Sequence, residues 1–97
     1  MYARMSRYQG SPEEIDESVR IGREKSVPAA RQLDGFNGVL ALADRKSGEQ
    51  IVITLWESEE AMRASEDAAN RIRDEGLTEG EEVASVGRYE VTMDERN

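Results

Sequence analysis

The sequence predicts an α+β fold made of two strand-helix-strand halves, and three observations predict it. Two strand-like runs, FNGVLALA at 36–43 and QIVITLW at 50–56, are separated by DRKSGE, whose turn residues suit a hairpin. Helix-start signals lie on either side of this pair, SPEE at 11–14 and SEE at 58–60. The run at 50–56 also carries apolar side chains on both of its faces.

The first strand is expected at residues 2–8, where YARMSRY mixes aromatic, methionine and polar positions over the length of a strand. A helix should begin directly afterwards. Ser11 is placed as its N-cap, Pro12 as its first residue, and Glu14 as the side chain that reaches back to complete a capping box.

Small and apolar side chains recur along one side of this first helix from Ile15 to Leu33, which predicts close docking on a sheet. Pro28 lies away from that stripe, so we expect one bent helix rather than two separate ones. Gly35 is the expected left-handed stop.

The second half repeats the pattern. Ser58 caps a helix with an acidic first turn, and Gly76 is its expected end. Residues 83–92, VASVGRYEVT, form the expected last strand, with Gly87 as either a bulge or a close-contact point.

This order is the ferredoxin-like βαββαβ arrangement: a single domain, 1–97, with a four-stranded antiparallel sheet and both helices on one face. The other face would be bare. It carries either Val52, Thr54 and Trp56 or their three alternating neighbours, and in both cases it is apolar. We therefore expect a homodimer through the sheet face, which forms a dimeric α/β barrel.

Composition excludes several classes of function. The net charge of -8 disfavours nucleic acid, because binding to phosphates needs concentrated Lys and Arg, and the strands lack the basic, aromatic surface of an RNA-recognition domain. Cysteine and histidine are both absent, so we expect no metal, haem or other cofactor. The acidic groups at 13–17 and 59–67 lie in first turns and on outer helix faces, where solvation and the helix dipole account for them.

No stretch approaches the roughly 18 apolar residues of a membrane span, and the first eight residues lack the apolar core of a signal peptide. We expect a soluble, cytoplasmic protein that does not bind membranes.

The stretch GFNGVLALADRKSGEQIVITLWESEEAMRAS at 35–65, with the preceding helix and the final VGRYEV, resembles the antibiotic biosynthesis monooxygenases of the dimeric α+β barrel superfamily. The most specific piece is WESEEA at 56–61. The resemblance implies a pocket between sheet and helices, lined by Trp56. Three positions depart from the family pattern: Val52 replaces a pocket amide, Met62 an aromatic hydroxyl, and Ser65 a histidine.

The candidate ligand-binding residues each have a structural alternative. Trp56, with Thr54 and Val52 on the same strand face, could line a pocket or plug the core and give its indole N–H to a carbonyl or water. Ser65 and Met62 would extend this wall, although Ser65 could instead bond back to the Ala61 carbonyl.

Arg4 alternates onto the same face of the first strand as Ser6 and Tyr8, so it would either hold an anion or pair with Glu90 or another acid of the last strand. Tyr89 could supply a phenol or simply pack.

Two functions remain. One is a cofactor-independent monooxygenase that acts on a small aromatic or enolisable substrate, with its catalytic residues unknown. The other is a non-catalytic dimeric module that binds a small apolar molecule or supports partner proteins.

Overall fold

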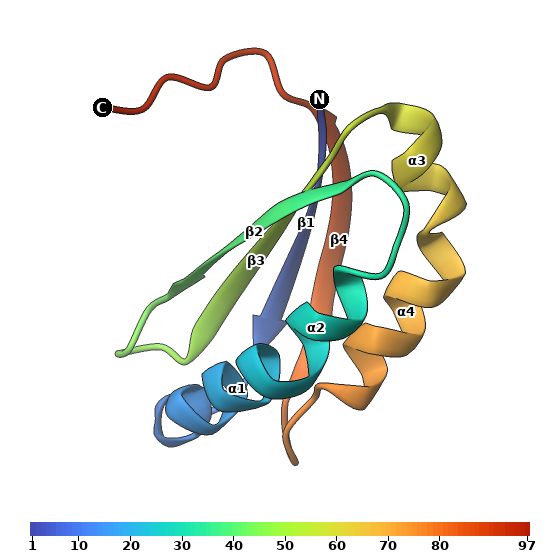
Figure 1. Cartoon of the computed structure of the whole chain (residues 1–97). Helices are drawn as coiled ribbons and strands as arrows, with labels where there is room; N and C mark the ends of the chain where they lie inside the picture. The colour runs from blue at the N-terminus through green and yellow to red at the C-terminus, as the bar shows by residue number, and fades with distance from the viewer.

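The computed structural model describes residues 1–97 and has one four-stranded antiparallel sheet of order β2-β3-β1-β4 (Figure 1). The strands are β1 (Tyr2–Gln9), β2 (Phe36–Ala43), β3 (Glu49–Trp56) and β4 (Glu82–Glu90). The α+β, ferredoxin-like order of the elements is therefore confirmed.

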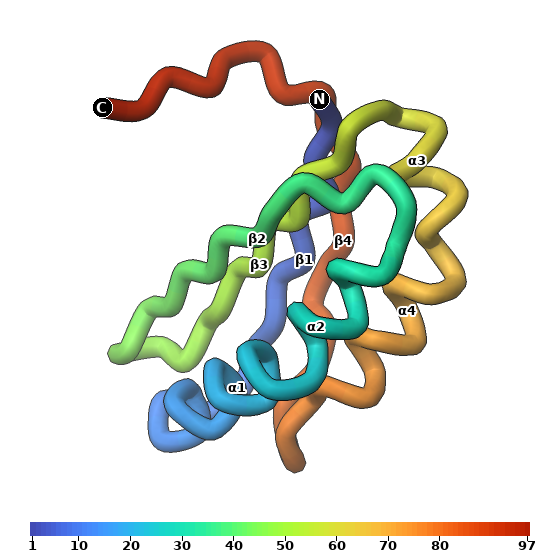
Figure 2. Tube along the Cα trace, viewed as in Figure 1, coloured from blue at the N-terminus to red at the C-terminus, as the bar shows by residue number.

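The central strand β1 fixes which side chains share a face. It pairs with β3 from Tyr2 opposite Trp56 to Gln9 opposite Glu49, and with β4 along its other edge. Arg4, Ser6 and Tyr8 therefore lie on the face that carries the helices. The trace in Figure 2 shows β1 between β3 and β4, with the N-terminus beside the end of β4.

The first helical run is continuous from residue 12 to 30. It consists of a 3₁₀ turn η1 (Pro12–Glu14), α1 (Ile15–Ile21), a π-helical turn η2 (Gly22–Ser26) and α2 (Val27–Ala30). The π turn comes just before Pro28, which has no N–H and whose ring would clash with the carbonyl one turn earlier. One helical run accommodates the proline, as expected.

Two local expectations were wrong, and a third was half right. The Ser11 side chain makes no capping hydrogen bond, because the first turn is 3₁₀ and Glu14 N–H bonds the Ser11 carbonyl instead. The helix ends at Ala30, before Gly35, although Gly35 does have a positive φ of 79°. The irregularity in β4 lies opposite Arg7 and Tyr8 and not at Gly87, but Gly87 is a close-contact point, because a Cβ there would lie 2.5 Å from the Tyr89 hydroxyl oxygen.

The second helical run is split into α3 (Glu59–Ala64) and α4 (Glu66–Glu75). The Ser58 hydroxyl caps α3 by accepting from Ala61 N–H at 3.1 Å, as the sequence predicts. The break falls at Ser65, whose N–H is shared between the Ala61 and Met62 carbonyls. Both helical runs cover the same face of the sheet (Figure 1).

The core is thin, since only nine of the 97 residues are buried. The largest buried side chains are Trp56, Ile15 and Met62. The uncovered face carries Leu40 and Leu42, which are 58% and 47% exposed. No helix has the length and hydropathy needed to cross a membrane.

The β2–β3 hairpin has a turn that only glycine can form. Gly48 has a φ of +83°, and a Cβ there would lie 2.2 Å from the Gly10 carbonyl oxygen. We expect Gly48→Ala to lower the free energy of unfolding by about 3 kcal/mol or more, because left-handed strain and a backbone clash add. Urea unfolding measures this.

The matched control is Gly80→Ala. Gly80 has almost the same φ, +85°, but a Cβ there meets nothing within 4 Å. This variant should lose only the left-handed cost of about 1 kcal/mol. Equal losses in the two variants would show that the close approach of Gly10 and Gly48 contributes nothing.

Candidate functional site

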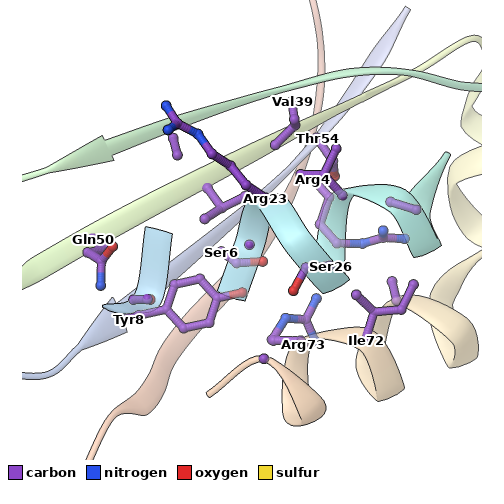
Figure 3. Close-up of a pocket in the computed structure, with 18 of the residues that line it drawn as sticks. Arg4, Ser6, Tyr8, Arg23, Ser26, Val39, Gln50, Thr54, Ile72 and Arg73 are labelled. Atoms are coloured by element: carbon purple, nitrogen blue, oxygen red, sulfur yellow. The ribbon is translucent and has the colours of Figure 1, made fainter. Parts of the chain in front are cut away.

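A cavity of about 470 Å³ lies between the sheet and the two helical runs, within the range of roughly 300–1,000 Å³ typical of small-molecule sites. Alternate residues of β1 and β3 form its floor, and η2, α2 and α4 form its walls (Figure 3). The floor consists of Arg4, Ser6, Tyr8, Gln50, Val52, Thr54 and Trp56.

Trp56 closes one end of the cavity and is 1% exposed. Its indole Nε1 donates to the Thr54 hydroxyl at 3.0 Å, in place of the carbonyl or water that the sequence suggested. Its ring meets Phe36 edge-on at a centroid distance of 5.6 Å, and the guanidinium of Arg4 lies 5.3 Å from its centroid. Trp56 therefore packs tightly and lines the cavity at the same time.

Arg4 is 2% exposed and is held by the second helical run. Its Nη2 donates to the Met62 carbonyl at 2.7 Å and to the Ser65 hydroxyl at 3.1 Å, and its Nε donates to Glu66 at 3.0 Å. In a regular helix the Glu66 N–H would occupy the Met62 carbonyl. Arg4 takes that acceptor, which accounts for the break between α3 and α4.

Glu66 bridges two arginines that would otherwise repel each other. Arg4 and Arg88 are directly paired across β1 and β4, so their side chains share a face. Glu66 binds Arg4 through Oε2 and Arg88 through Oε1, with Arg88 Nε at 2.9 Å. The expected pairing of Arg4 with Glu90 is wrong, because Glu90 lies opposite Tyr2 and one carboxylate of α4 neutralises both arginines.

The pKa values follow from this network. Burial lowers the pKa of Arg4, while the hydrogen bond and charge of Glu66 act in the opposite direction. For Glu66, burial favours the neutral acid, but the hydrogen bonds from Arg88 and Arg4 outweigh it and lower its pKa. The group is therefore an ionised triad at neutral pH.

The seven sequence-predicted site residues divide into two groups. Arg4, Val52, Thr54 and Trp56 line the cavity together. Met62, Ser65 and Tyr89 do not line it.

Met62 and Ser65 lie behind Arg4, and the Ser65 hydroxyl donates to the Met62 carbonyl at 2.7 Å rather than to Ala61. Tyr89 is 53% exposed on the opposite face, because it pairs with Ala3 and lies over Gly87.

The far end of the cavity holds residues that sequence reasoning missed. Tyr8 and Gln50 face each other across β1 and β3, and Arg73 of α4 lies beside Tyr8 (Figure 3). Glu81 closes this end: it accepts from Gln50 Nε2 at 3.0 Å and from the Ser18 hydroxyl at 3.3 Å. The alternation of β1 already placed Tyr8 with Arg4, but nothing in the sequence brings α4 or Glu81 to them.

Acidic side chains do not gather into a metal site. No group of three or more carboxylates in the structure could hold a metal ion.

The fold is that of the antibiotic biosynthesis monooxygenases. SnoaB from Streptomyces nogalater, a cofactor-independent oxygenase, is 15% identical with a TM-score of 0.69, over 96% of this chain and 94% of that one. MhuD from Mycobacterium tuberculosis, a haem degrader with two haems in its active site, is 20% identical with a TM-score of 0.76, over 99% and 100%. These likenesses define the fold class.

Two uncharacterized proteins of Mycobacterium tuberculosis are more similar in sequence. Rv2558 is 33% identical over 93 residues, which make up 96% of this chain and 39% of Rv2558. Rv2557 is 40% identical over 74 residues, 76% of this chain and 33% of Rv2557. The chain thus spans well under half the length of these relatives. No family model matches the sequence.

The bridging carboxylate gives a direct test of this site. We expect Glu66→Gln to lower the free energy of unfolding by about 3 kcal/mol, because it leaves Arg4 buried without a counter-charge. Glu59→Gln, which removes an exposed partner of Arg63, should cost less than about 1 kcal/mol. Thermal and urea melts of both variants measure the difference.

The stabilisation that Glu66 gives to the folded state depends on pH. Because the folded-state pKa of Glu66 is lowered, its stabilisation is complete above the unfolded value of about 4.3 and disappears as the pH falls through the lower folded value. The difference in the free energy of unfolding between wild type and Glu66→Gln should therefore become smaller only below about pH 4.3. A difference in the free energy of unfolding that stays constant from pH 7 to 3 would contradict an ionised Glu66 between Arg4 and Arg88.

Proposed function

We propose that this chain binds a small aromatic, enolisable molecule in the cavity and oxygenates it without a cofactor. The observation that carries the proposal is a cavity of about 470 Å³ whose end is formed by a buried tryptophan and a buried arginine. The fold shared with SnoaB, a cofactor-independent oxygenase, supports it.

Arg4 is the residue placed to stabilise an anion. Its Nε and Nη2 are used by α3 and α4, while Nη1 donates to no group of the protein. Arg4 lines the cavity, and its guanidinium lies 5.3 Å from the centroid of the Trp56 ring. An enolate oxygen within reach of Nη1 would gain a charge-assisted hydrogen bond.

The chemistry balances without an external reductant. Loss of one proton from a ring CH₂ gives the enolate, which transfers one electron to O₂, and the two radicals combine as a peroxide. Cleavage of the O–O bond, with loss of the second hydrogen, leaves a carbonyl on the substrate. The hydroxide released takes up a proton to form water. The protein's part is to orient the substrate and stabilise its anion.

Haem, the ligand of MhuD, does not fit the donors of this cavity. Haem iron is held in proteins by His, Cys, Met or Tyr, and Tyr8 is the one such side chain among the lining residues. Burial raises the pKa of Tyr8 and so disfavours the phenolate that iron would need. No step through haem is assigned to this chain.

Anthrone, a tricyclic aromatic ketone with an acidic CH₂, provides the test. We expect oxygen uptake above the uncatalysed rate, with one ¹⁸O atom from ¹⁸O₂ in the anthraquinone formed. Val52→Phe should abolish the catalysed rate because it fills the cavity floor, whereas Val52→Ala should retain it. Mass spectrometry measures the ¹⁸O content of the product, and an oxygen electrode measures the rate of oxygen uptake of each variant.

A non-catalytic binding module is the second candidate. One observation favours it: Glu81, the one carboxylate among the lining residues, is already taken by Gln50, Ser18 and Thr78 and so is not free to act as a base. Binding of anthrone, seen as quenching of Trp56 fluorescence, with no oxygen uptake would establish this function and exclude the oxygenase.

We further propose that the protein acts as a homodimer joined through the uncovered sheet face. Register places Leu40, Leu42, Met5, Ile51, Ile53 and Leu55 on that face. Four strands about 4.8 Å apart and eight residues long span roughly 500 Å² per copy, so two copies would bury about 1,000 Å², near the lower limit for a specific interface.

This proposal predicts a dimer by sedimentation equilibrium at micromolar concentration. Leu40→Glu combined with Leu42→Glu should give a folded monomer, because it places carboxylates in an apolar contact. Ala29→Glu, on the exposed side of α2, should leave the dimer intact. A monomeric wild type would contradict the proposal.

A further inference from the structure

The two ends of the cavity differ in chemistry. Trp56 pairs with Tyr2 at one end of the sheet, and Gln50 pairs with Tyr8 at the other. Trp56 lies six positions after Gln50 on β3, about 20 Å at roughly 3.4 Å per residue. A ligand bound along this floor would therefore meet an aromatic wall at one end and polar side chains at the other.

Arg73 is a cationic group at the polar end, which also holds the Glu81 carboxylate. It projects from α4 beside the Tyr8 phenol and below Ser26 (Figure 3). Its Nη1 donates to Asn70 Oδ1 at 2.6 Å, one turn back on the same helix. The chain has 21 acidic side chains, yet Arg73 forms no salt bridge with any of them. An arginine that faces a cavity without a carboxylate partner has donors available for a ligand.

Arg23 adds a second cation from the opposite wall. It belongs to η2, is exposed, and reaches the same cavity. It also forms no salt bridge, in contrast to Arg20 one turn earlier, which is paired with Glu17 and Glu24. Arg23 thus lines the cavity without a carboxylate partner, but its guanidinium points away from Arg73 and Tyr8 (Figure 3).

We propose that this end of the cavity is an anion subsite, in which Arg73 and Tyr8 hold the carboxylate of an aromatic acid whose ring lies towards Trp56. The proposal rests on the proposed function and deepens it by naming the substrate class.

The hydrogen-bonding character of the two residues suits a carboxylate. Arginine offers planar, parallel N–H groups to both oxygens. Burial raises the pKa of Tyr8, with Arg73 and Ser6 acting in the opposite direction, so the phenol stays protonated and can donate. Glu81 lies at the same end, but its oxygens already accept from Gln50, Ser18 and Thr78.

Two ligands of nearly the same shape, one an anion and one neutral, test the subsite: anthraquinone-2-carboxylate and anthraquinone-2-carboxamide, titrated calorimetrically. We expect the carboxylate to bind wild type about tenfold more tightly, the effect of one charge-assisted hydrogen bond. Arg73→Gln should remove that advantage and change carboxamide binding less than about twofold, whereas Arg73→Lys should retain part of it.

Arg71→Gln is the matched control, because Arg71 lies on the same helix, is exposed and does not line the cavity. It should leave both affinities unchanged. Equal affinity of wild type for the two ligands, or an equal loss in Arg71→Gln and Arg73→Gln, overturns the anion subsite and leaves the proposed function standing. Failure of wild type to bind either ligand overturns both. If Arg73→Gln does not fold, the ratio of carboxylate affinity to carboxamide affinity is compared between wild type and Arg73→Lys. A ratio that is equal in these two proteins overturns the anion subsite.

Discussion

The contact between Glu66 and two arginines is the constraint on which the site depends. Arg4 and Arg88 lie side by side on adjacent strands, and one carboxylate from α4 joins both. This contact fixes α4 against the helix-covered face, so the wall that carries Arg73 stands at a set distance from the floor. It also takes the Met62 carbonyl out of the helical ladder, and the break at Ser65 follows. A buried ion pair of this kind costs desolvation, which close hydrogen bonds offset.

A second constraint is the small size of the hydrophobic core. With nine residues buried, the space between sheet and helices is partly an open cavity rather than packed side chains. Small residues on the first helical run, such as Gly22, Ser26 and Ala30, leave that space unfilled. Trp56 then serves two purposes at one position: it supplies most of the packing at its end of the sheet and presents an aromatic wall to a ligand.

The two faces of the sheet have different roles because strand side chains alternate. Thr54 and Trp56 point to the cavity, while Ile53 and Leu55, on the same strand, point to the uncovered side. One strand therefore contributes to both the proposed ligand site and the proposed dimer contact. A shift of register by one residue would exchange the two sets, which ties the assembly to the site.

Local sequence determined the order of the elements. Alternation in QIVITLW, the cap at Ser58 and the turn residues before Gly48 depend on neighbours in the chain, so they could be predicted, and alternation also placed Thr54 with Trp56 on one face of their strand. Tertiary structure alone decided which face was covered, that Arg4 binds Glu66 rather than Glu90, and that Arg73 and Glu81 join the cavity. The hydrogen bonds of Arg4 with Glu66 and of Gln50 with Glu81 join residues 62 and 31 positions apart, and periodicity along one segment carries no information about the docking of another.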